Sequence, residues 1–158
     1  MKGVDLLRLF IERTNPKDAE KLWKIQRRAF LDDFKKYQDP MNPYNETLER
    51  LKEKIHDFIY YTIYIDELII GGADIRKKSQ THYRLNRIYI DPTYQNKGYG
   101  FNAIKFIEES LPNASIWDLD TPHLSFSNQH LYEKLGYKKV GEHKISEKLT
   151  LIDYMKKI

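Results

Sequence analysis

The chain has 158 residues, a formal net charge of +4 and a hydrophobic fraction of 41%. A chain of this length can form one domain with a substantial core, and we expect a single domain over residues 1–158. It contains no cysteine, which excludes disulfide bonds, cysteine-based zinc sites and a cysteine nucleophile. The absence of cysteine also suits a reducing cytoplasm, where we expect the protein to be. The longest apolar stretches, such as Phe58–Ile65, fall far short of the roughly 20 residues that span a bilayer, so we expect no membrane partner.

The positive charge raises the question of nucleic-acid binding. Lysine and glutamate alternate closely within Leu48–Lys54 and Glu142–Lys148, a pattern typical of a solvated face. We therefore expect no nucleic-acid partner. A modest positive field would instead favour an anionic cofactor that carries several phosphates.

The first part of the chain predicts one strand and two helices. Leu6–Arg13 has the pattern of a strand. A helix should follow with Asn15 as its N-cap and Pro16 in its first turn, and apolar residues then recur at helical spacing. After a loop with two prolines, we expect Asn45 to cap the second helix.

The middle of the chain predicts an antiparallel meander. Phe58–Ile65, Leu68–Arg76 and Tyr83–Ile90 are strand-like, and Asp66-Glu67 suits a tight turn between the first two. The helix Phe101–Leu111 should follow. Its apolar residues lie on one face.

The last part predicts a strand-helix-strand crossover and a final strand. The expected elements are the strand Ser115–Leu119, the helix Gln129–Leu135 and the strands Tyr137–Gly141 and Leu149–Tyr154. The element order indicates an α+β (mixed α/β) fold. Its core would be a mixed, mostly antiparallel sheet of about six to seven strands, flanked by helices on both faces.

The loop between the third predicted strand of the meander and the next helix has the features of an anion site. The strand ends at Pro92, and the loop carries Gln95, Gly98 and Gly100 directly before the helix. The first N–H groups of a helix have no internal partner and lie at its positive end. Glycine lets a phosphate approach the main chain closely. The Gly-Lys-Ser/Thr and Gly-x-Gly-x-x-Gly phosphate motifs are absent.

Two segments together resemble the GCN5-related N-acetyltransferases, the GNAT superfamily. The first is Gln95-x-x-Gly98-x-Gly100 after a strand that ends in x-Pro. The second is Asn128-Gln-His-Leu-Tyr-Glu-Lys-Leu-Gly-Tyr137, which is similar to the C-terminal motif of that family. The resemblance implies transfer of an acetyl group from acetyl-CoA to a primary amine by direct attack. The alternative is a regulatory protein of this fold that binds CoA or acyl-CoA without catalysis.

The resemblance also implies roles for individual residues. The pyrophosphate of acetyl-CoA would be held by the main chain of the loop formed by Gln95, Asn96, Lys97, Gly98, Tyr99 and Gly100. The pantetheine arm would pair with the main chain of Ile88, Tyr89 and Ile90 and contact Asn128. Tyr132 would donate a proton to the CoA sulfur. No metal is expected, and a homodimer could form through Tyr137–Ile158.

The chain departs from the family pattern at two places. Many relatives place seven residues between the asparagine and the tyrosine of the second motif, whereas Asn128 and Tyr132 are four apart. Relatives often carry a glutamate on the strand before the loop, where this chain has Asn86, which cannot act as a base. Another group must therefore accept the proton of the amine.

Four residues are candidates for that proton acceptor. Glu46 lies in the loop between the first two helices and is our first candidate, and the others are Asp118, Asp120 and His123. In relatives, the first two helices select the substrate. Asp32 and Asp33 in this region predict a cationic acceptor, either a small-molecule amine or the amine of a peptide or protein.

Overall fold

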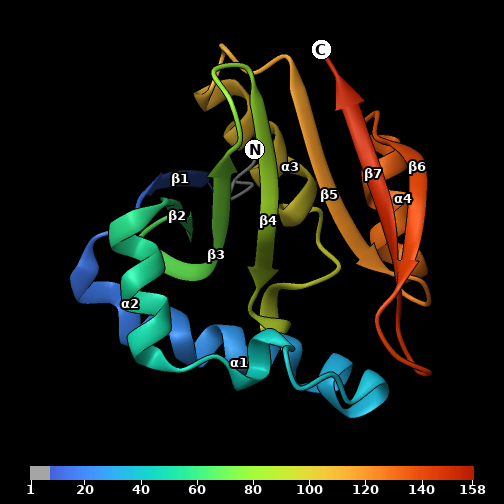
Figure 1. The fold of residues 1–158 in the computed structure, drawn as a ribbon. Coiled ribbons are helices and arrows are strands. Elements are labelled where there is room, and N and C mark those ends of the chain that lie inside the picture. Colours follow the sequence, from blue (N-terminus) through green and yellow to red (C-terminus); the bar gives the residue numbers. More distant parts are fainter. Residues whose placement is uncertain (1–7) are drawn as a thin grey trace, which may run out of the picture.

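The computed structural model describes residues 8–158. It contains a seven-stranded sheet in the order β1-β2-β3-β4-β5-β7-β6, which confirms the predicted α+β fold (Figure 1). The strands are β1 Leu9–Arg13, β2 Ile59–Ile65, β3 Leu68–Lys77, β4 His82–Ile90, β5 Ile116–Pro122, β6 Lys138–Lys144 and β7 Thr150–Lys157. The helices are α1 Ala19–Tyr37, α2 Leu48–Asp57, α3 Tyr99–Ser110 and α4 Phe126–Lys134. The start of the predicted strand Leu6–Arg13 lies outside the described residues.

Helices cover both faces of this sheet (Figure 1). One core cluster places α1 and α2 against Tyr60, Ile69 and Tyr89. A second cluster lies on the other face, where α3 and α4 pack against Leu85 and Trp117. No helix among residues 8–158 is long and apolar enough to cross a bilayer.

The helix starts follow local capping chemistry. The side chain of Asn15 accepts a hydrogen bond from the N–H of Lys17, as predicted, although a 3₁₀ turn precedes α1. The predicted cap of α2 was wrong. Asn45 ends a separate 3₁₀ turn, and the Thr47 hydroxyl instead accepts from the N–H of Arg50 at 3.1 Å. Thr47 has extended backbone angles and stands immediately before the first helical residue, which is the geometry that an N-cap requires.

Two adjacent glycines let β3 approach β4. A Cβ at Gly71 would lie 2.1 Å from the carbonyl oxygen of Tyr89. A Cβ at Gly72 would lie 2.5 Å from the Tyr89 hydroxyl. That hydroxyl is buried and hydrogen-bonds the Tyr60 hydroxyl at 2.8 Å. The two glycines therefore make room for the strand that leads into the glycine loop.

The two halves of the sheet separate between β4 and β5. These parallel strands pair only from His82 to Arg84, opposite Ile116 to Asp118. The register between β3 and β4 shifts at Asn86, so that this residue forms a bulge. Because a bulge bends its strand and increases the twist, the second half of β4 diverges from β5. The divergence opens a V-shaped gap in the sheet.

Candidate active site

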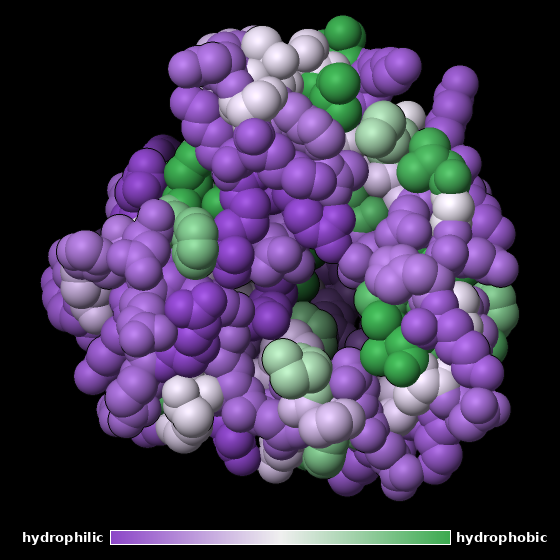
Figure 2. Space-filling view, in the orientation of Figure 1, coloured by the Kyte–Doolittle hydropathy of each residue, from purple (hydrophilic) through white to green (hydrophobic). Residues whose placement is uncertain are grey.

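A cavity of about 690 Å³ occupies the gap between β4 and β5. In the view of Figure 2, the surface is largely hydrophilic and is hollowed between these two strands, beyond the stretch where they pair. The cavity is bounded by α1, the end of β4, the glycine loop, the start of α3 and the segment from Leu124 to Tyr132. Eight of the ten predicted cofactor-binding residues line it: Ile88, Tyr89, Ile90, Gln95, Asn96, Tyr99, Gly100 and Asn128.

The glycine loop ends at the N-terminus of α3. Gly98 is the N-cap residue, with a φ of 82° that disfavours other residues. Gly100 is the second helical residue and faces the cavity. The first turn of α3 carries no acidic residue, so the positive end of the helix is available to an anion. Lys97 and Gly98 are exposed and do not line the cavity.

The main chain of β4 offers donors to the cavity. The N–H of Asp91 donates to the carbonyl of Ile70 in β3. Because N–H groups alternate along a strand, those of Ile90 and Ile88 point the other way, into the gap that β5 has left. Tyr89 contributes its backbone to the ladder with Gly72. Its side chain packs on Phe30 of α1, with ring centroids 6.3 Å apart.

On the other side of the gap, α4 brings Tyr132 to the cavity. Its side chain is 7% exposed and packs on the rings of Tyr137 and Tyr154, at centroid distances of 6.0 Å and 6.2 Å. Burial raises the pKa of Tyr132, and the negative charge of Asp120 raises it further. The phenol is therefore protonated at physiological pH.

Asn128 is not the cap of α4. The helix begins at Phe126, so Asn128 lies in its first turn, and Ser125 is the N-cap residue. Asn128 donates to the Thr121 hydroxyl at 3.4 Å and lines the cavity. Ser125, seven residues before Tyr132, also lines the cavity. Its residue type differs from the asparagine of the family motif, so the sequence pattern gave no signal for it.

Glu46 lies outside the cavity in a buried polar network. Its carboxylate accepts from Lys54, from Arg87 at 3.0 Å and from Gln26 at 3.1 Å, and its side chain is 9% exposed. Burial alone would raise the pKa of Glu46, but Arg87, Lys54 and Gln26 outweigh it and lower the pKa. Such a carboxylate is held as an anion. This environment suits a structural ion pair better than a base poised near neutral pH.

The pKa of Lys54, a partner of Glu46 in this network, reflects the cost of burying a charge. Burial lowers the pKa of Lys54, and the charge of Arg87 lowers it further, although Glu46 acts in the opposite direction. The pKa of Glu46 therefore indicates a favourable pair, whereas that of Lys54 indicates a net penalty. Both directions of pKa shift are expected if the carboxylate of Glu46 mainly compensates Lys54 and Arg87, which have already lost their hydration.

The position of the usual strand glutamate has a different role here. The side-chain amide of Asn86 donates to the carboxylate of Asp74 at 2.9 Å, and Arg76 donates to the same carboxylate at 2.9 Å and 3.0 Å. Asp74 is fully buried. A glutamate at position 86 would face this carboxylate, so an amide donor fits the site better.

The other candidate bases, Asp118, Asp120 and His123, also have hydrogen-bond partners within the protein. Asp118 accepts from Arg84 at 2.6 Å and from His82. Burial opposes ionisation of Asp118, but Arg84, His82 and Lys78 together lower its pKa. Asp120 accepts from the same Arg84 at 2.7 Å. The ring of His123 contacts the backbone of Thr150 at 3.0 Å.

Carboxylates from α1 complete the wall of the cavity. Asp32, Asp33 and Lys36 line it opposite the glycine loop. Burial raises the pKa of Asp33; Lys36 opposes this, and Asp32 adds to it. A positively charged group in the cavity would stabilise both carboxylates as anions.

Comparison with known families decides the assignment. A model described as the acetyltransferase (GNAT) family matches residues 19–137. The chain belongs to the GNAT family. The match spans α1, the meander, the glycine loop and α4 with Tyr137, and so includes both motifs of the sequence. No curated protein matches the chain in sequence.

Solved structures share the GNAT fold at low sequence identity. The ribosomal-protein-S18-alanine N-acetyltransferase of Escherichia coli is 14% identical, with a TM-score of 0.78 over 96% of this chain and 94% of the other. The PaiA N-acetyltransferase of Thermoplasma acidophilum, solved with coenzyme A, is 17% identical, with a TM-score of 0.77 over 96% and 100%. A protein of Salmonella typhimurium solved with acetyl-CoA is 14% identical, with a TM-score of 0.73 over 94% and 93%.

Proposed function

We propose that the protein is an acetyl-CoA-dependent N-acetyltransferase that acts on a primary amine. The observation that carries this proposal is the single cavity that joins three separate parts of the GNAT chain. These are the glycine loop at the start of α3, the unpaired edge of β4 and the largely buried side chain of Tyr132. The GNAT structures solved with coenzyme A and acetyl-CoA support the cofactor class.

The residues of the cavity fit that cofactor. Gly98 has open space beside it, since nothing lies within 4 Å of the position that a Cβ would take. The free N–H groups of the first turn of α3 would bind the pyrophosphate. The outward N–H groups of Ile88 and Ile90 would bind the pantetheine arm and stabilise negative charge on the acetyl oxygen. Bound acetyl-CoA supplies the activated thioester, and Tyr132 would give its proton to the departing sulfur.

Binding of acetyl-CoA tests the first half of the proposal. At about 100 times Kd, acetyl-CoA should raise the free energy of unfolding by roughly 2.7 kcal/mol, which corresponds to a shift of several degrees in Tm. Gly100→Asp should abolish this shift, because a carboxylate in the first turn repels phosphate while it favours the helix itself. The measurement is thermal unfolding with and without acetyl-CoA.

Gly100→Ala is the matched control for this experiment. A Cβ at position 100 lies 3.8 Å from Leu131, an ordinary contact, so this variant should fold and keep most of the shift. Gly98 is less suitable because its positive φ strains any other residue. If acetyl-CoA stabilises Gly100→Asp as much as the wild type, the cofactor does not bind at α3.

Release of the CoA thiol tests the second half. Amine-dependent thiol release supports the transferase. The alternative, a regulatory protein that binds CoA without turnover, predicts a shift in Tm but no thiol release with any amine. We also propose that the protein acts in the cytoplasm, without nucleic acid, as a monomer or homodimer.

The wall of α1 favours a cationic acceptor. Asp33→Asn should raise the KM of spermidine roughly tenfold, about 1.4 kcal/mol of binding free energy, because a desolvated carboxylate attracts an ammonium group strongly. The KM of acetyl-CoA should stay unchanged. Steady-state thiol release with the wild type and the variant measures both constants.

Asp39→Asn is the control for that measurement. Asp39 belongs to the same acidic region, but its carboxylate accepts from the N–H of Met41 at 3.0 Å and does not line the cavity. If the KM for spermidine is the same in Asp33→Asn and the wild type, Asp33 does not contribute to acceptor binding.

A further inference from the structure

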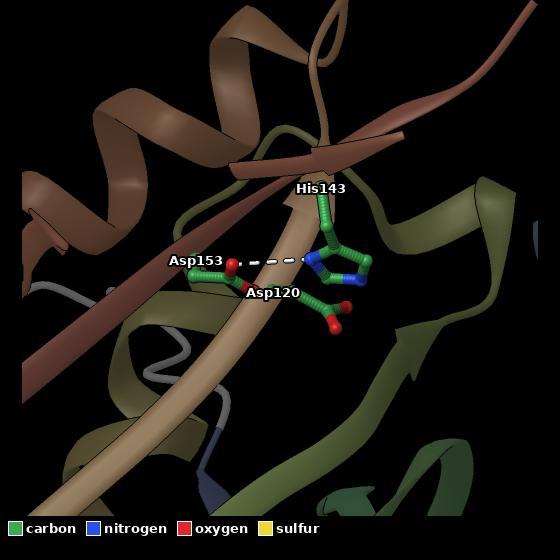
Figure 3. A group of neighbouring side chains, drawn as sticks. All are labelled: Asp120, His143 and Asp153. Atoms are coloured by element: carbon green, nitrogen blue, oxygen red, sulfur yellow. Dashed lines mark hydrogen bonds and ion pairs between the residues drawn. The ribbon is translucent and has the colours of Figure 1, made fainter. Parts of the chain in front are cut away.

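Three titratable side chains that have no role in the acetyl transfer proposed above form a cluster on the sheet. One carboxylate oxygen each of Asp120 and Asp153 and one ring nitrogen of His143 lie within 4.8 Å of one another. They come from β5, β7 and β6, and Figure 3 shows their side chains directed toward a common point. All three are partly exposed, with side-chain exposures of 25%, 34% and 47% for Asp120, Asp153 and His143.

Strand register explains why these residues meet. Asp120 pairs directly with Asp153 across the antiparallel strands β5 and β7. Gly141 of β6 pairs with Asp153, and His143 lies two residues further on. Residues directly opposite, and residues two apart, share a face of a sheet. Leu119 and Tyr154 are buried in the core under α3 and α4, so the cluster occupies the opposite face.

The cluster begins where β4 and β5 stop pairing, although none of its three residues lines the cavity. Asp120 is two residues beyond Asp118, the last residue of β5 that pairs with β4. It therefore stands where the strands begin to separate. The charge of Asp120 acts on the hydroxyl of Tyr132 from the other face and raises the pKa of that phenol. The hydroxyl of Tyr132 and the carboxylate of Asp120 are therefore near enough for the charge of one to act on the other, although they belong to opposite faces of the sheet.

The hydrogen bond of His143 sets its tautomer. Its Nδ1 lies 3.1 Å from the carboxylate of Asp153. A carboxylate accepts this bond, so in the neutral form of the ring Nδ1 carries the hydrogen and the other nitrogen keeps its lone pair. Figure 3 shows that second nitrogen on the side of Asp120.

From this geometry we propose that His143 accepts the proton of the acceptor amine, with Asp153 holding its tautomer and Asp120 attracting the ammonium group. The inference rests on the proposed acetyl transfer. The ammonium group loses one proton to His143, and the free amine then forms the N–C bond as the C–S bond breaks. Tyr132 gives its proton to sulfur and regains one from the amine nitrogen, so one proton is released overall. Arg84 donates to the carboxylate of Asp120 at 2.7 Å.

A matched pair of probe amines tests the proposal. Ethylamine is protonated near neutral pH, whereas methoxyamine has nearly the same size and is neutral. His143→Gln should lower kcat/KM for ethylamine about 100-fold, a usual contribution of a general base, and change that for methoxyamine less than about twofold. Asp153→Asn should show the same selective loss, to a smaller extent. Thiol release at saturating acetyl-CoA measures the rates.

His56→Gln is the control, because His56 forms a similar pair with Asp57 at 2.8 Å on an exposed face of α2. This variant should match the wild type with both amines. The variant His143→Gln should have the same Tm as the wild type, because the side chain of His143 is half-exposed.

Different failures have different meanings in this design. Equal losses with both amines, or no loss, would overturn the role of His143 while leaving the acetyl transfer intact. A wild-type rate that falls with a chelator and returns with zinc would also overturn it, in favour of a metal at the cluster. Wild-type protein that binds acetyl-CoA but releases no thiol with either probe amine or with spermidine would overturn the transferase itself, and the inference with it.

Discussion

Replacing Glu46 by glutamine is expected to lower the free energy of unfolding by about 3 kcal/mol, because the loss leaves two buried cations without their anion. Lys54 and Arg87 both donate to this carboxylate, and the side chains of Glu46 and Lys54 are 9% and 6% exposed. The amide would keep the contact with Gln26 but could not compensate either charge. Urea unfolding at neutral pH measures the difference.

The pH dependence of the same variant has a defined sign. The pKa of Glu46 is lowered in the folded protein from its ordinary value of 4.5. The stability contributed by the anion is therefore present above that value and is lost as the pH falls toward the folded pKa. The difference in stability between the wild type and Glu46→Gln should accordingly shrink in acid.

Glu53→Gln is a suitable control, since Glu53 is 62% exposed and pairs with Arg50 of the same helix at 3.1 Å. It should change the stability by less than about 0.5 kcal/mol. If Glu46→Gln were as stable as the wild type but lost most of its kcat, Glu46 would be the general base after all.

Replacing Tyr132 by phenylalanine is expected to lower kcat by one to two orders of magnitude, about 1.4–2.8 kcal/mol in activation free energy. The side chain is buried beside the cavity, and the phenol is protonated at neutral pH, so it has a proton to give to the sulfur. The effect stays at the low end for general acids because a thiolate already leaves fairly easily. Acetyl-CoA binding should change little, since the loop and α3 are untouched.

Tyr154→Phe is the matched control for Tyr132. Its ring packs in the same aromatic cluster, but its hydroxyl donates to Glu133 at 2.8 Å and does not line the cavity. It should cost some stability and leave kcat nearly unchanged. An unchanged kcat in Tyr132→Phe would show that this ring serves only for packing.

Sequence reasoning predicted the glycine loop well because its signals are local. Pro92 ends the extended strand, and Gly98 supplies the positive φ just before α3. The same holds for Asn15, which caps its turn through its own neighbours. It failed at Asn45, because Thr47 two residues later is the N-cap of α2 and only the final backbone path decided between these two polar residues.

Long-range partners could not be predicted in this way. Glu46 resembled an exposed loop carboxylate in the sequence, and its burial depends on Arg87 from a strand 41 residues away. In the sequence, Asn86 stands where relatives often carry a glutamate that can act as a base. In the structure, its amide donates a hydrogen bond to the buried carboxylate of Asp74. The side chains that Gly71 and Gly72 must leave room for belong to another strand, which two adjacent glycines within a strand do not identify by themselves.

The sequence by itself determined the element order, the α+β class and the resemblance of two motifs to the GNAT family, because periodicity, capping and turn chemistry act over a few residues. The tertiary structure alone decided which side chains share the cavity and which share each face of the sheet. The meeting of Asp120, His143 and Asp153 depends on strand register, and register is fixed by packing of the whole sheet rather than by any local segment.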